Sequence, residues 1–229
     1  MSDLFSAKVL HYYKHLKKPQ NLPIEVEALF PFPNEDVWSV NEAFYQRFFN
    51  DKKKRSFLIG INPGRLGAGI TGIPFTDPIR LKNVLEIENS FDQKAELSSK
   101  FIYEVIDLMG GPKAFYAHFY FTSVSPIGFV MNNKNLNYYD IKELEIALKE
   151  FIVKELWTQI NELPCHRDLA FCLGRGKNFS YLKKLNDEER FFKDIVPLPH
   201  PRWVMQYRLK KKDEYLLEYQ KSLNSVISS

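Results

Sequence analysis

An almost continuous apolar run, Ser56–Ile61, ends abruptly at Asn62-Pro63-Gly64. A strand with one face in water alternates apolar and polar side chains, whereas a strand of a parallel sheet is covered on both faces and is apolar throughout. The run is therefore typical of a central parallel strand whose carboxyl end leads directly into polar, turn-forming residues.

Helical and apolar segments alternate along the rest of the chain. Three further apolar runs predict strands over 119–124, 169–173 and 192–198. Apolar spacing predicts six helices. Two lie in the first 50 residues, over 4–16 and from a cap at Asn34 or Asp36 to 49. The others run from just after Ser98 or Ser99 to 109, from a cap at Asp140 to 160, from the turn that ends at 178 to 185, and over 213–223. This alternation predicts a doubly wound α/β fold with about four mainly parallel strands flanked by helices.

Composition bounds the class of protein. With 229 residues and 45% hydrophobic residues, the chain fits one domain over 1–229, comprising a helical lead-in over 1–50, a motif-bearing core over 55–208 and a C-terminal helix over 213–224. The two cysteines, the absence of a signal-like start and the lack of a long apolar run predict a cytoplasmic protein with no membrane span. We expect a monomer.

Polar or glycine-rich segments follow all four predicted strands: Asn62-Pro63-Gly64-Arg65, Ser123-Val124-Ser125-Pro126, Gly174-Arg175-Gly176-Lys177 and His200-Pro201-Arg202. The carboxyl ends of parallel strands meet at one edge of the sheet, where open α/β folds bind their ligands. We therefore expect one shared site. The basic run at 52–55 precedes a strand, so it is interpreted as a solvated face on the opposite edge.

The side chains at these strand ends suit a nucleobase. Asn62 offers both a donor and an acceptor, so it can hold a water or read an amide-like edge. His200 can donate to a carbonyl oxygen that gains negative charge, and Phe75 can supply a stacking face. Taken alone, each has an ordinary structural reading: a turn, a hydrogen-bonding histidine and a core aromatic.

The order of the motifs decides between these readings. Gly60-Ile61-Asn62-Pro63-Gly64, followed by Thr71-Gly72-Ile73-Pro74-Phe75, resembles the first motif of single-strand-selective monofunctional uracil-DNA glycosylases. Gly110-Gly111-Pro112, Gly174-Arg175 and His200-Pro201 are similar to later segments of that family, in the same order. The overall form looks most like the family's second, bacterial branch.

The resemblance implies a three-layer uracil-DNA glycosylase-like fold that uses no metal and no cofactor. It implies a monofunctional enzyme that flips uracil or a related damaged base out of single- or double-stranded DNA and leaves an abasic site. Asn62 would position the hydrolytic water and His200 would stabilise the departing anion at its O2. The family's roles further imply that Gly64 lets the base approach and that Phe75 stacks on it.

Further site residues follow from the same resemblance. Ile61 and Ser123 are expected beside the base, where Ser123 replaces the family's base-reading Asn and puts strict uracil selectivity in question. The segment Pro201–Arg208 is expected to be a loop that enters the duplex. The residues expected to contact DNA are Arg65, Arg175, Lys177, Arg202, Trp203 and Arg208.

Other interpretations of the sequence stay open. A non-catalytic module that recognises DNA lesions is one alternative, and a small-molecule nucleotide-binding protein using the glycine-rich loop is another. Trp203, Val204 and Met205 suit either an apolar wedge or packed core. The run at 210–212 suits either a solvated surface or phosphate contact.

Overall fold

The predicted parallel sheet is present in the computed structural model, which describes residues 3–227. Its strand order is β3-β2-β6-β7, and all three pairings are parallel. The strands are β2 (Ser56–Gly60), β3 (Phe119–Ser123), β6 (Leu169–Leu173) and β7 (Asp194–Leu198). Every residue of β2 and β3 is buried, as expected for strands covered on both faces.

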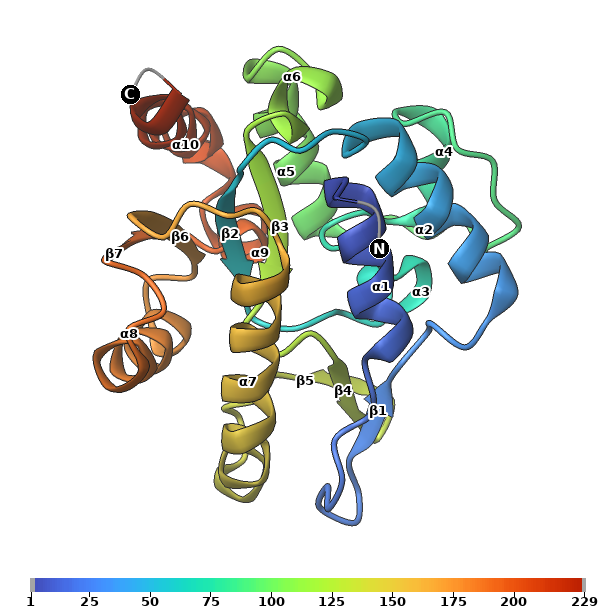
Figure 1. Ribbon diagram of the computed structural model, residues 1–229, viewed down its shortest axis with the longest axis vertical. Coiled ribbons are helices and arrows are strands. Elements are labelled where there is room, and N and C mark those ends of the chain that lie inside the picture. Colours follow the sequence, from blue (N-terminus) through green and yellow to red (C-terminus); the bar gives the residue numbers. More distant parts are fainter. Residues whose placement is uncertain (1–2, 228–229) are drawn as a thin grey trace.

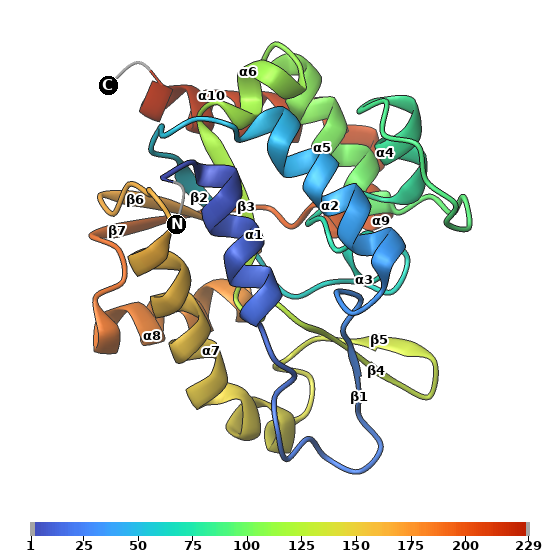
Figure 2. The ribbon, with the colours of Figure 1, turned by 45° about the vertical axis from the view of Figure 1, so that its right-hand side comes forward.

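Helices cover both faces of this sheet and complete the predicted α/β architecture. In Figures 1 and 2, α1 and α7 lie on one face, whereas α5, α9 and α10 lie on the other. The helices are α1 (Phe5–His15), α2 (Glu35–Phe48), α3 (Ala68–Thr71), α4 (Pro78–Asn83), α5 (Leu97–Leu108), α6 (Pro112–Tyr116), α7 (Lys142–Glu162), α8 (Lys177–Glu189), α9 (Pro201–Tyr207) and α10 (Lys212–Ile227).

A second, antiparallel sheet was not predicted from the sequence. It comprises β1 (Glu27–Leu29), β4 (Gly128–Met131) and β5 (Lys134–Leu136) in the order β1-β4-β5, and it lies at the lower right of Figure 2. Asn132 and Asn133, with φ of 50° and 59°, form the two-residue turn between β4 and β5. That left-handed pair is typical of hairpin turns. The sheet places the segment after β5 beside the end of β2.

Of three predicted helix starts, one is confirmed and two differ. Asn34, one of the two predicted caps, begins α2, because its side-chain oxygen accepts the N–H groups of Asp36 and Val37. Asp140 does not cap α7; its carboxylate accepts the N–H of Asn137, within the turn that leads into the helix. Similarly, α5 begins at Leu97, so Ser98 and Ser99 lie inside it.

The segment that was predicted to be a loop entering DNA is the helix α9. Pro201 occupies its first turn, where the missing N–H costs nothing and the fixed φ suits a helix. The ring of His200 accepts the N–H of Arg202 and so caps the helix. Val204 and Met205 are buried, which assigns them to the core and not to a wedge.

The prediction that residues 52–55 form a solvated face is wrong for Arg55. Lys52, Lys53 and Lys54 are exposed, but Arg55 is completely buried. Its guanidinium forms an ion pair with Asp51 at 2.8 Å and lies over the ring of Phe5. Arg55, which directly precedes β2, can be buried because a carboxylate and backbone carbonyls accept hydrogen bonds from its guanidinium.

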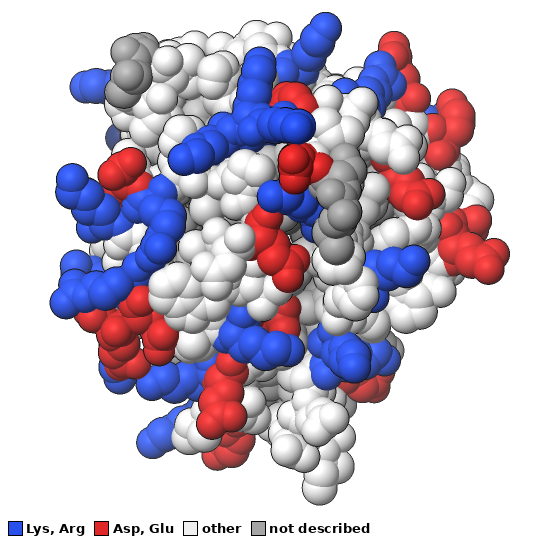
Figure 3. All heavy atoms as spheres, in the orientation of Figure 1, with Lys and Arg blue, Asp and Glu red and all other residues white. Residues whose placement is uncertain are grey.

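The chain carries a formal net charge of +4, with 32 Lys and Arg against 28 Asp and Glu, but the basic residues do not gather on the face shown in Figure 3. Lys and Arg side chains are spread over it with Asp and Glu among them. Among the helices of residues 3–227, none has the length and apolar character that crossing a bilayer requires.

Candidate active site

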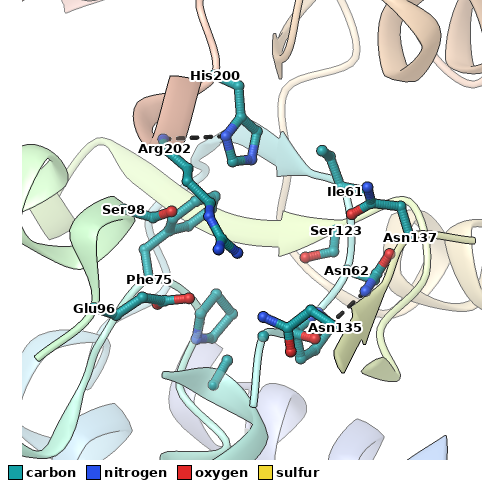
Figure 4. A pocket seen from close by; sticks show the side chains of 14 residues that line it. Ile61, Asn62, Phe75, Glu96, Ser98, Ser123, Asn135, Asn137, His200 and Arg202 are labelled. Carbon is teal, nitrogen blue, oxygen red and sulfur yellow. Dashed lines mark hydrogen bonds between the residues drawn. The ribbon is translucent and has the colours of Figure 1, made fainter. Parts of the chain in front are cut away.

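Three of the four predicted strand ends meet in one pocket (Figure 4). The sheet register explains this convergence, because Gly60 lies opposite Ser123 and the strands run in the same direction. The turn after β6 contributes no lining residue. The lining residues are Ile61, Asn62, Pro63, Gly64, Ala68, Pro74, Phe75, Glu96, Ser98, Ser123, Asn135, Asn137, His200 and Arg202.

The Asn62 amide is held from two sides by the last residue of β5 and the segment that follows it. Its Nδ2 donates to the carbonyl of Leu136 at 3.2 Å, and its Oδ1 accepts the N–H of Tyr138 at 3.1 Å. These partners fix which amide atom is the oxygen, since one is a carbonyl and the other an N–H. The oxygen keeps a second lone pair, so a water could be held in one orientation.

A buried hydrogen-bond network fixes the backbone groups that hold Asn62. The Tyr138 hydroxyl donates to Oδ1 of Asn178 at 2.9 Å. The Nδ2 of Asn178 in turn donates to the carbonyl of Gly60 at 3.4 Å. The network connects the start of α8, the end of β2 and the segment after β5. It makes Asn62 part of a rigid frame and not of a free turn.

Phe75 forms one wall of the pocket through an unusual backbone conformation. Its φ of 54° is left-handed, which is rare for a bulky residue and is found where surrounding structure fixes a side chain. A Cβ at Gly60 would lie 2.8 Å from the Phe75 ring, so only glycine lets the ring cross the end of β2. The ring is half-buried and its free side faces the pocket.

Of the two hydroxyls at the end of β3, only that of Ser123 faces this pocket. Thr122 donates to the Gln159 side chain at 2.7 Å on the α7 side of the sheet. Ser123 is 7% exposed and lines the pocket beside Ile61. Because successive strand residues point to opposite faces, the two hydroxyls cannot share one ligand.

His200 is a neutral donor in this structure. Its Nδ1 accepts the N–H of Arg202 at 3.1 Å, so the ring proton resides on Nε2, the nitrogen left for the pocket. Burial, and then the positive charge of Arg202, lower the pKa of His200 to about 4. The ring therefore carries no charge at neutral pH and can donate one hydrogen bond to an oxygen.

Comparison with known proteins assigns this chain to a protein family. The sequence pattern of the Uracil DNA glycosylase superfamily matches residues 46–224. The chain belongs to the uracil-DNA glycosylase superfamily. The crystal structure of wild-type SMUG2 from Pedobacter heparinus is 42% identical, with a TM-score of 0.94 and 99% of each chain covered. Family and structure together support a uracil-DNA glycosylase type of function and confirm the predicted resemblance and fold.

Four of the five cations predicted to contact DNA divide into two groups in this glycosylase-superfamily chain. Arg202 lines the pocket, and with Arg65 it also lines an adjoining groove of about 460 Å³. Arg175 instead forms an ion pair with Glu218 on α10, and the Lys177 ammonium lies 5.8 Å from the ring centre of Tyr139. Neither of these two lines the pocket or the groove.

Trp203 and Arg208 form a small surface unit on α9. The Arg208 guanidinium lies 4.9 Å from the centre of the Trp203 ring, which packs edge-on against Tyr215 of α10. Trp203 is 39% exposed, unlike its buried neighbours Val204 and Met205. The indole is therefore supported by α10 but accessible from outside.

Several lining residues were missed by the sequence analysis. Asn135 and Asn137 reach the pocket from the unpredicted hairpin, and Glu96 reaches it from a stretch to which no site residue was assigned. The Asn132-Asn133 turn after a short apolar run was the available signal for the hairpin. Within residues 3–227, no group of three or more His, Cys, Asp or Glu side chains is arranged to hold a metal ion.

Proposed function

We propose that the protein flips uracil or a related damaged base out of DNA and hydrolyses its N-glycosidic bond, leaving an abasic site for base excision repair. The observation that carries the proposal is the meeting of Asn62, Phe75, Ser123 and His200 in one pocket. Each supplies a different requirement of the reaction: a held water, a stacking face, a polar contact to the base and an anion-stabilising donor.

The sizes of the pocket and of the groove beside it limit what the pocket can hold. The pocket has a volume of about 80 Å³, and the groove next to it has a volume of about 460 Å³. Because a cavity of ~150 Å³ holds a benzene ring, the pocket excludes anything larger than one base ring and must widen to admit one. The sugar and phosphates would then lie in the groove lined by Arg65 and Arg202.

Hydrolysis of the N-glycosidic bond requires mainly the donor of His200 and the water held by Asn62. As the N-glycosidic bond breaks, the sugar becomes oxocarbenium-like and the uracil leaves as an anion. The neutral His200 donates from Nε2 to O2, where negative charge develops. The clamped Asn62 orients the water that completes hydrolysis. The base must first leave the stack, which costs a few kcal/mol and favours mispaired or single-stranded sites.

The test is incubation with labelled oligonucleotides that contain uracil, hydroxymethyluracil, xanthine or hypoxanthine, followed by alkali, which cuts at abasic sites. Strand cleavage at the modified position is expected. Salt-dependent binding of the same oligonucleotides without cleavage would indicate a non-catalytic lesion-binding module. Binding of free nucleotides but not of DNA would indicate the nucleotide-binding alternative.

Replacing Ser123 with Asn is expected to increase the preference for uracil. A hydroxyl makes one directed contact, whereas an amide can donate to and accept from two neighbouring edge atoms. The measurement is the ratio of single-turnover excision rates for uracil and xanthine. Thr122→Asn, on the other side of the sheet, is the matched control for crowding at the end of β3. An unchanged or lower ratio in Ser123→Asn would remove Ser123 from base recognition.

Replacing Trp203 with Ala is expected to weaken excision from duplex DNA several-fold more than from single strands. Only the duplex requires an apolar side chain to occupy the space that the flipped base leaves. Tyr215→Leu removes the edge-on packing partner without removing the indole, and so reports on packing alone. Equal losses on both substrates, with a lower melting temperature, would show that Trp203 only packs on α10.

A further inference from the structure

Glu96 places an acidic side chain inside the candidate base pocket. It directly precedes α5, and its backbone N–H donates to the Asp77 carboxylate at 2.8 Å, which fixes its position. Its carboxyl group points into the pocket, opposite Asn135 (Figure 4). Within the described residues, that carboxyl group accepts no hydrogen bond and forms no ion pair with Arg202.

The carboxyl group occupies the space above two glycines of the first motif. A Cβ at Gly64 would lie 2.7 Å from Oε1 of Glu96, and a Cβ at Gly67 would overlap Oε2. Neither position therefore tolerates a side chain while Glu96 holds this place. A base that approaches the bare backbone of Gly64 must meet the Glu96 carboxyl group.

We propose that Glu96 is a specificity-determining residue that reads the substituent at C5 of a flipped pyrimidine. This inference rests on the proposed function. If His200 contacts O2 and Ser123 contacts the neighbouring N3 edge, the ring order of a pyrimidine turns C5 toward Gly64. The substituent at C5 then faces the Glu96 carboxyl group.

The chemistry of a carboxyl group determines which substituent at C5 is favoured and which is rejected. A carboxylate oxygen accepts a hydrogen bond from the hydroxyl of a 5-hydroxymethyl group. The methyl group of thymine offers no donor and would strip water from the carboxyl group without replacing it. A hydrogen at C5, as in uracil, leaves room for water. Glu96 therefore favours hydroxymethyluracil and rejects thymine, the normal base of DNA.

The charge around Glu96 is compatible with this role. Burial, and then the nearby Asp77 carboxylate, raise the pKa of Glu96 to about 7, while Arg202 acts in the opposite direction. The cations Arg65 and Lys134 line the adjoining groove. In either protonation state the carboxyl group keeps an oxygen that can accept the hydroxyl.

The test measures binding as well as base release. Short single strands carry 2′-fluoro analogues of deoxyuridine, hydroxymethyldeoxyuridine or thymidine, because the fluorine destabilises an oxocarbenium-like sugar and slows hydrolysis. The wild-type protein is expected to bind the hydroxymethyl strand at least about ten-fold more tightly than the thymine strand. Glu96→Leu, which keeps the bulk but no acceptor, should abolish this ratio, and Glu96→Gln, which keeps one oxygen, should retain part of it.

Asp92→Asn, an exposed change in the same segment, is the matched control and should keep the wild-type ratio. Melting temperatures verify that every variant is folded. An identical affinity ratio in the wild type and Glu96→Leu, or a wild-type ratio near one, overturns the role of Glu96 even if uracil is released normally. Conversely, selective binding without release from ordinary substrates overturns the proposed function and leaves the role of Glu96 standing.

Discussion

Replacing Asn62 with Ala is expected to lower single-turnover uracil excision by about 10²–10³-fold while DNA binding changes little. The loss follows because an unoriented water must find the attacking geometry by chance, and groups that position or activate a nucleophile contribute rate factors of this size. The measurement is abasic-site formation with enzyme in excess over a uracil-containing single strand.

The same substitution has a structural effect that must be separated from the chemical one. It removes the hydrogen bonds to Leu136 and Tyr138, each of which contributes ~0.5–1.5 kcal/mol to the free energy of unfolding. Asn89→Ala is the matched control, because the Asn89 amide also makes two hydrogen bonds to the backbone, to the carbonyls of Pro78 and Ile87, but lies outside the pocket. The control should melt at a similarly reduced temperature and excise uracil normally. Excision by Asn62→Ala within a few-fold of wild type would exclude Asn62 from the mechanism.

The central sheet could be predicted because its physical signals are local. A strand covered on both faces must be apolar along its whole length, so β2, β3 and β6 stand out in the sequence. Parallel pairing then brings the carboxyl ends to one edge. Asn62, Ser123 and His200 could be placed together from this rule and from the order of the motifs, before any side-chain contact was known.

The rest of the site depends on contacts between distant segments, which the local sequence does not encode. The strands β1 and β5 have three residues each, too few for a clear periodic pattern. The hydrogen bonds that hold Asn62 come from backbone groups of Leu136 and Tyr138, and these groups are supplied by almost any sequence that lacks proline at position 138. Glu96 looked like one of many surface acids, because burial in a pocket leaves no mark on its neighbours in sequence.

The helix α9 was missed for a different reason. His200-Pro201 matched the start of a motif that was expected to be a loop, and this expectation outweighed the ordinary helix signal of Pro in the first turn. The structure gives His200 two tasks at once, since one ring nitrogen caps the helix and the other faces the pocket. Position and protonation of the catalytic candidate are therefore set by the same hydrogen bond.

This double role predicts that His200→Ala and His200→Asn differ in stability but not in activity. Asn is a strong helix cap and can accept the Arg202 N–H as the His200 ring does, so His200→Asn should melt near the wild-type temperature. His200→Ala loses the cap and should melt lower. Both variants lose the Nε2–H donor, and removing one donor to a developing oxyanion typically costs ~10²–10³-fold in rate. Single-turnover excision by either variant close to wild type would remove His200 from catalysis.

The pH dependence tests whether the donor is neutral. With its pKa lowered to about 4, His200 is uncharged throughout pH 5–8, so it contributes no change in excision rate across that range. A protonated donor with an ordinary pKa near ~6.5 would instead lose rate about ten-fold per unit as the pH rises above that value. Because the pKa of Glu96 is about 7, the profile is measured in Glu96→Gln, where any remaining titration cannot come from Glu96. A flat profile in that variant supports the neutral imidazole, whereas a decline above pH 6.5 would show that His200 acts as a cation.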